Sequence, residues 1–147
     1  MNNELILSTI IIGLWTLFVI SCLFNGSKID VQTKNIKKVY WIATAITVDF
    51  ALYLINGISV WNIVLMIVML FVTSLYISIP SGYNNKGIYI RGFYFPYRKI
   101  EDMGVERVLH TNRLNFKCFY RILYIDSDSY QELKDCETLF KKEKMYD

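Results

Sequence analysis

The stretch LILSTIIIGLWTLFVISCLF, residues 5–24, contains no charged side chain. A helix needs about 20 apolar residues to cross the hydrocarbon core of a bilayer. Residues 60–79 form a second uncharged run of the same length, and residues 39–55 form a third in which Asp49 is the one charged side chain. The last two runs are separated only by Asn56–Ser59, which has the composition of a turn. The sequence therefore predicts three transmembrane helices, the second and third of which form a tight antiparallel hairpin.

Charged residues are separated from apolar ones along this chain. Of the 147 residues, 54% are apolar and 20% are charged, and nearly every Lys and Arg lies in the 25–38 segment or after residue 81. A soluble protein mixes the two kinds along amphipathic elements, so the separation favours a membrane protein. Met1–Glu4 contains no basic residue and no small-x-small cleavage site follows the first run, which favours a retained helix over a signal peptide.

The basic residues predict the orientation. Four lysines lie between the first two helices, and Lys86, Arg91, Arg98 and Lys99 follow the third, whereas the N-terminus and the 56–59 turn contain none. Because basic segments stay in the cytoplasm, we expect the N-terminus outside and the C-terminus inside a bacterial cytoplasmic membrane. The domain boundaries expected are 1–80 for the three-helix membrane domain and 81–147 for a cytoplasmic domain.

Asp49 is predicted to lie near the middle of the bilayer. It is ten residues beyond Val39, or about 15 Å along a helix, in a core about 30 Å thick. Tyr53 and Asn56 share its helical face, and Trp15 and Thr16 lie at a similar depth on the first helix, so these five residues form a candidate polar site. We expect a neutral carboxyl group. Three interpretations remain open: a structural link between helices or subunits, a proton or substrate relay, and contact with a partner helix.

The tail after residue 81 predicts a small α+β domain of about four or five strands. Residues 88–97 indicate a hairpin that turns at Arg91-Gly92, a third strand is expected at about 104–109, and the strongest strand signal covers 115–125. Ser129 and Glu132 have the spacing of a capping box at the start of a final helix.

Residues 86–142 resemble the PH-like domains of small bacterial membrane proteins. The residues that carry this resemblance are Gly87-Ile88-Tyr89-Ile90, Gly92, Phe95-Pro96-Tyr97 and Ile100. Such proteins belong largely to families of unknown function found in Firmicutes. The resemblance implies a PH-like fold and a binding role for the cytoplasmic domain.

A basic and aromatic face is the second candidate site. Its members are cationic or phenolic side chains that suit anionic headgroups or a protein partner, namely Lys86, Arg91, Tyr94, Arg98 and Lys99. His110 has no second ligand at metal-binding spacing, and the three cysteines form no CxxC pair, so neither a metal nor another cofactor is expected. No catalytic motif and no nucleic-acid-binding motif occurs in the sequence.

Three classes of function follow from these patterns. The first is a non-enzymatic integral membrane protein that presents a PH-like module to the membrane surface or to a protein partner. The second is a bacteriocin or toxin immunity protein that acts through its helices. The third is an accessory subunit of a transporter or membrane enzyme, in which Asp49 is functional. The expected partners are the lipid bilayer and either a protein or a second copy that contacts the helices.

Overall fold

The computed structural model describes residues 3–33, 38–56 and 59–146, and it divides the chain into two compact units. The helical unit comprises Met1–Leu23 and Lys37–Ile79. The strand unit comprises Phe24–Ile36 and Pro80–Asp147. The segment between the first two helices thus belongs to the strand unit, a connection that the sequence boundary at 80/81 did not anticipate.

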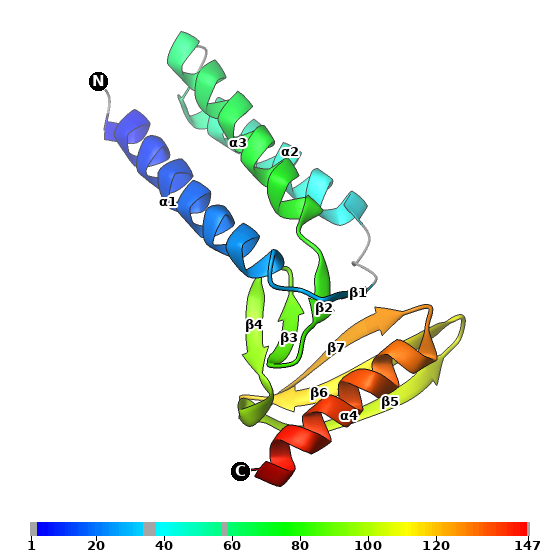
Figure 1. The fold of residues 1–147 in the computed structure, drawn as a ribbon. Coiled ribbons are helices and arrows are strands. Elements are labelled where there is room, and N and C mark those ends of the chain that lie inside the picture. Colours follow the sequence, from blue (N-terminus) through cyan, green and yellow to red (C-terminus); the bar gives the residue numbers. More distant parts are fainter. Residues whose placement is uncertain (1–2, 34–37, 57–58, 147) are drawn as a thin grey trace. The chain divides into compact units, whose positions relative to one another are not determined.

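The helical unit contains α1 (Asn3–Gly26), α2 (Lys38–Asn56) and α3 (Val60–Ser78), close to the ranges predicted (Figure 1). Two stretches, Leu5–Gly26 in α1 and the whole of α3, are long and apolar enough to cross a membrane. The Ser59 hydroxyl accepts a hydrogen bond from the backbone N–H of Asn62 and caps the N-terminus of α3. Leucine, isoleucine and valine side chains remain exposed along these helices, as expected for surfaces that face lipid.

A narrow stripe on each helix is buried within this unit. On α1 the stripe follows residues 8, 12, 19 and 22, which is the three- and four-residue spacing of one helical face. Val19 and Cys22 pack against Val72 and Tyr76 of α3. The Trp15 ring meets the Tyr76 ring edge-on, with their centroids 5.3 Å apart.

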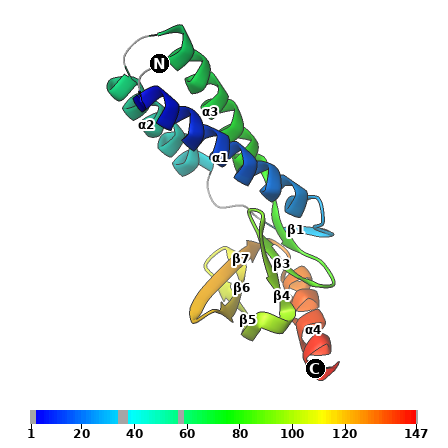
Figure 2. The same cartoon turned by 90° about the vertical axis from the view of Figure 1, so that its left-hand side faces the viewer.

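The described part of the strand unit contains seven strands in two antiparallel sheets. The first sheet has the order β1-β2-β3-β4 and the second β5-β6-β7, and the helix α4 packs against the second (Figures 1 and 2). The bounds of these elements are β1 Val31–Thr33, β2 Ser81–Tyr83, β3 Gly87–Ile90, β4 Phe93–Pro96, a 3₁₀ turn Tyr97–Lys99, β5 Ile100–Val108, β6 Thr111–Cys118, β7 Arg121–Ser127 and α4 Tyr130–Tyr146. The tail from residue 81 contributes six of these strands, β2–β7, so the prediction of four or five strands for it was too low.

The predicted β3–β4 hairpin is confirmed, and the predicted strand at 115–125 is wrong. Arg91 and Gly92 both have positive φ, at 47° and 85°, as a two-residue type I′ turn requires. Residues 115–125 belong to two strands, because the chain reverses at Phe119-Tyr120. The preceding turn lies at Leu109-His110, and Thr111 already belongs to β6.

Strand β1 completes the first sheet and comes from the segment between α1 and α2. Val31 pairs with Tyr83 and Thr33 pairs with Ser81. The two strands approach so closely at Gly82 that a Cβ atom there would overlap the carbonyl oxygen of Val31 and lie 2.6 Å from Cγ2 of Ile29. The absence of a side chain at Gly82 is therefore a condition for β1 to pair.

The core of the strand unit lies between the two sheets and α4. Tyr97, Ile100, Phe116 and Leu133 are fully buried in it. The Tyr97 hydroxyl donates to the carbonyl oxygen of Asn84 at 2.9 Å and lies 3.5 Å from Sγ of Cys136. Burial raises the pKa of the Cys136 thiol to about 12, so this cysteine stays protonated and unreactive.

The capping of α4 follows the predicted motif in part. The backbone N–H of Glu132 donates to the Ser129 hydroxyl at 3.3 Å. The Glu132 carboxylate accepts from the Ser127 hydroxyl at 2.8 Å, so it does not complete the reciprocal bond of a capping box.

Glu137 on α4 makes the stability of the strand unit depend on pH. Lys134 and Lys141 donate to its carboxylate at 2.6 and 2.7 Å, and these bonds lower its pKa. A carboxyl group with a lowered folded-state pKa stabilises the fold above its ordinary pKa, and this contribution is lost as the pH falls. We expect the melting temperature to fall as the pH drops below the ordinary pKa of a glutamate side chain, 4.5, and to fall less in Glu137→Gln. Equal pH dependence in both proteins would contradict this assignment.

Candidate functional site

Asp49 is buried inside the helical unit with no bonding partner in the described part of the chain. Its side chain is 3% exposed, and neither carboxyl oxygen has a hydrogen-bond partner there. Ala45, one turn earlier on the same face of α2, is also buried. An unpaired polar group in an apolar interior is costly, so this side chain is the most unusual one in the helical unit.

The residues grouped with Asp49 from the sequence have separate bonding arrangements. The Thr16 hydroxyl donates to the carbonyl oxygen of Ile12 on its own helix at 2.8 Å. Tyr53 is half-buried and its ring stacks on that of Phe50. The indole N–H of Trp15 is buried without a partner among the described residues, so it does not bond to Asp49. The side chain of Asn56 lies outside the described part of the structure.

Thr73 on α3 was not predicted as a member of this polar group. Its hydroxyl is buried and, among the described residues, has no partner. Thr73 and Ala45 both line a hollow of about 440 Å³ between α2 and α3, which otherwise has mainly apolar walls. Because a lone threonine in an apolar run is common, no sequence signal distinguished it. Thr73 lies at the same hollow as Ala45 only because α2 and α3 pair, and the sequence does not show which residues this pairing brings together.

A basic-aromatic end of the strand unit gathers four of the five residues predicted for the second site. The Tyr94 hydroxyl and the Tyr97 backbone N–H both donate to the Lys86 carbonyl oxygen. Arg98 and Lys99 follow in the adjoining 3₁₀ turn, and the ammonium group of Lys99 lies 5.5 Å from the centre of the Phe119 ring. We define the basic-aromatic end as the residues Lys86, Tyr94, Arg98, Lys99, Phe119 and Tyr120.

Arg91 is not part of this end. It is 8% exposed and lies in the β3–β4 turn, whereas Lys86 precedes the other end of β3. Its backbone N–H donates to the Ser81 hydroxyl, and the Asn25 side chain donates to the carbonyl oxygen of the next residue, Gly92. Arg91 is therefore packed inside the strand unit and does not belong to the exposed basic and aromatic face that was predicted.

Phe119 and Tyr120 were missed as surface residues because the sequence reads as one continuous strand through them. Both have positive φ, at 51° and 62°, and their side chains are 61% and 92% exposed. The left-handed conformation costs about 1–2 kcal/mol for each residue with a Cβ atom, and Asn-Gly is the usual pair in such a turn. This turn therefore displays two large aromatic side chains at a conformational cost.

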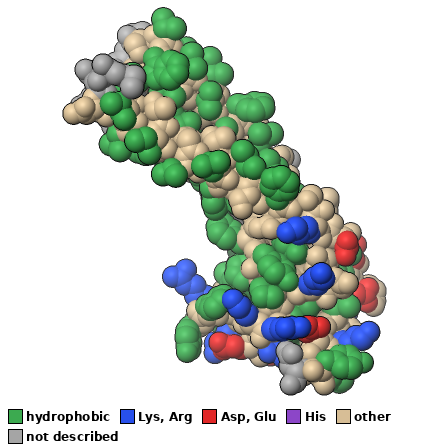
Figure 3. Space-filling model, turned by 60° about the vertical axis from the view of Figure 1, so that its left-hand side comes forward, with side chains coloured by type: hydrophobic (Ala, Val, Ile, Leu, Met, Phe, Trp, Pro, Cys, Tyr) green, Lys and Arg blue, Asp and Glu red, His purple; other side chains and the backbone are tan. Residues whose placement is uncertain are grey.

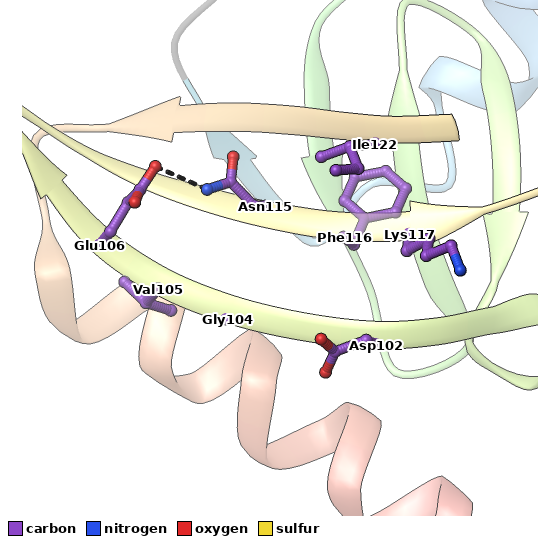
Figure 4. Close-up of a pocket in the computed structure, with 8 residues that line it drawn as sticks. All are labelled: Asp102, Gly104, Val105, Glu106, Asn115, Phe116, Lys117 and Ile122. Atoms are coloured by element: carbon purple, nitrogen blue, oxygen red, sulfur yellow. Dashed lines mark hydrogen bonds between the residues drawn. The ribbon is translucent and has the colours of Figure 1, made fainter. Parts of the chain in front are cut away.

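A shallow hollow of about 340 Å³ lies on the β5-β6-β7 sheet. Gly104 leaves it open, since nothing lies within 4 Å of the position of a Cβ atom there. Asp102, Glu106, Asn115 and Ile122 are among the residues that line it, and the Asn115 amide donates to the Glu106 carboxylate at 2.6 Å (Figure 4). Lys117 at its rim is bonded to Glu101 at 2.7 Å. The polar side chains at this hollow thus bond largely to other side chains of the same sheet.

On the face drawn in Figure 3, the charged side chains lie on the strand unit and not along the apolar helices of the helical unit. Within the described residues, no group of three or more His, Cys, Asp or Glu side chains could hold a metal ion. The three cysteines are free and buried, which leaves the Cys22 thiol inside the packing of α1 and α3.

No protein-family model, no curated protein and no solved structure matches this chain. The arrangement of its own residues is therefore the basis for the proposals that follow.

Proposed function

We propose that this protein is a non-enzymatic membrane-anchored adaptor. Three helices hold a PH-like module on the cytoplasmic side of a bacterial membrane, and the module recognises a partner there. The observation that carries this proposal is the pairing of β1 with β2, which builds one sheet from two segments that each follow a membrane helix.

The β1–β2 pairing supports three spans rather than two. Strand β1 begins five residues after the end of α1, and β2 begins three residues after the end of α3. Because the two strands pair, α1 and α3 must end on the same side of the membrane. If α3 crosses the bilayer, it begins on the opposite side, so α2 must also cross to reach it. Asp49 would then lie within a transmembrane helix.

The arrangement of the strand unit supports the PH-like assignment. The resemblance implies a small module of antiparallel strands closed by a C-terminal helix, and the described part of this unit has two antiparallel sheets of four and three strands that pack with α4 around one core. Three strands beyond the four located from the sequence come from β1, β2 and the division of residues 111–127 into two strands.

The buried polar groups of the strand unit hold its loops together. Asn84 donates to the carbonyl oxygen of Lys28 and accepts from the backbone N–H groups of Lys86 and Gly87. Tyr83 donates to the carbonyl oxygen of Glu132. These bonds fix the loops of the module that we propose to recognise a partner.

Topology reporters test this proposal. A reporter that works only in the cytoplasm is expected to be active when it is fused after Asp147. A reporter that works only outside the cytoplasm is expected to be active when it is fused before Met1. We also expect a cysteine introduced in the 56–59 turn to react with a membrane-impermeant thiol reagent in intact cells. Opposite reactivity, or an exported C-terminus, would contradict the proposed orientation and with it the cytoplasmic adaptor.

The burial of Asp49 favours a second candidate function. A carboxyl group without a partner in the described residues suits a protein whose helices engage another membrane protein, as an immunity protein or an accessory subunit would. A variant with Asp49→Asn that inserts and folds normally but loses the cellular phenotype would support this alternative. Loss of the phenotype only when residues 81–147 are disrupted would support the adaptor.

A further inference from the structure

We propose that the basic-aromatic end is a docking site for an acidic segment of a partner protein. This inference rests on the proposed adaptor function and names the chemistry of its partner. The partner segment would place carboxylates against Lys86, Arg98 and Lys99 and apolar side chains against the Phe119-Tyr120 turn.

The backbone of the turn is the first observation behind this proposal. Among the described residues, Phe119 and Tyr120 are the only consecutive pair without glycine in which both have positive φ. Nothing in the fold requires aromatic rings at this place, because both side chains point mostly into solvent. Ile122, two residues further along β7, is 74% exposed and extends the apolar surface. Exposed aromatic side chains next to arginine are typical of protein-binding surfaces.

The charge around the turn is the second observation, and it specifies the partner. Lysine and arginine predominate: Lys86, Arg98, Lys99, Lys117 and Arg121 lie within this end or border the turn. Three acids neutralise part of this charge, since Glu101 bonds to Lys117, Asp102 lies opposite Lys117 in the β5–β6 register, and Glu143 bonds to Arg98. The excess positive charge complements an acidic polypeptide.

The mixture of basic and aromatic side chains at this end favours a protein segment over a lipid headgroup. The Phe119 and Tyr120 side chains are 61% and 92% exposed beside the lysines and arginines. A protein segment supplies apolar side chains for these rings together with carboxylates for the cations, whereas an anionic headgroup supplies the negative charge alone.

A binding assay with a double variant tests the inference. The full-length protein is reconstituted in nanodiscs of phosphatidylcholine, and a fluorescent random copolymer of glutamate and tyrosine serves as the probe. Anisotropy is expected to show saturable binding that weakens with salt, whereas a lysine-tyrosine copolymer does not bind. The substitutions F119N and Y120G introduce the preferred type I′ pair, so they are expected to raise the melting temperature by a few degrees and weaken binding at least tenfold.

A second turn provides the matched control. Leu109 also has positive φ, at 51°, and is 96% exposed in the β5–β6 turn. The substitution L109N should likewise relieve strain and leave copolymer binding unchanged. Equal binding by the wild type and the F119N/Y120G variant, or no binding by the wild type, would overturn the inference. If the nanodisc-bound protein instead sediments with phosphatidylglycerol vesicles through these residues, the acidic-protein partner is wrong while the adaptor function still stands.

Discussion

Replacing Gly82 with alanine is expected to detach β1 from the sheet and destabilise the strand unit by about 3 kcal/mol or more. The new Cβ atom would overlap the carbonyl oxygen of Val31, and this contact is with backbone that cannot rotate away. Relief requires a shift of β1, which would break its pairing with β2 and expose the edge of that strand. The hydrogen bond between the Asn84 amide and the Lys28 carbonyl would be lost in the same movement.

Gly104→Ala is the matched control for this substitution. Gly104 is also a strand glycine, but nothing lies within 4 Å of its Cβ position. We expect its unfolding free energy to change by about 0.5 kcal/mol or less. Hydrogen exchange of the purified protein in detergent should show faster exchange at residues 31–33 and 81–83 in Gly82→Ala only. Wild-type protection of these amides in Gly82→Ala would contradict the close approach of the two strands.

Replacing Asp49 with leucine is expected to stabilise the helical unit by about 1–3 kcal/mol. Both carboxyl oxygens are buried and lack a partner in the described part of the chain, so the substitution removes a desolvation cost without removing an observed bond. The change can be measured from the unfolding of the reconstituted protein by increasing mole fractions of sodium dodecyl sulfate.

Two further substitutions make this measurement specific. Thr47→Leu places the same apolar side chain on the exposed face of α2, where the Thr47 hydroxyl bonds only to the carbonyl oxygen of Ala43. Its effect should be small. Asp49→Asn keeps a polar group in the buried position and should not reproduce the gain. A loss of stability in Asp49→Leu would instead mean that the carboxyl group joins the helices or joins copies of the chain.

The helices could be predicted from the sequence because long apolar runs need no distant partner to be recognised. The predicted run 5–24 lies within α1, and 39–55 lies within α2. Strand β1 could not be predicted, because it has three residues and its partner is about 50 residues further along the chain. The Phe119-Tyr120 turn was also hidden, since neither residue is a usual turn residue and both favour strands.

Prediction of the candidate sites failed where side-chain orientation decides the outcome. Arg91 has the charge expected of a surface residue, yet its place in a tight turn buries it beside Ser81. Phe119 joins Lys99 although the two are 20 residues apart, because Ile100 pairs with Cys118. Asp49 could be recognised as a candidate from the sequence alone, because an acidic residue stands out in a run of apolar residues.

The division of the first sheet between two chain segments has a consequence for how the protein is made. Residues 31–33 leave the ribosome before residues 81–83, and two more helices are synthesised between them. The nascent β1 must therefore remain without its partner until α2 and α3 have been synthesised, so the first sheet can be completed only after the whole helical unit has been made. For the same reason, a fragment that begins at residue 81 would lack β1. It would expose the unpaired edge of β2, which favours aggregation during expression.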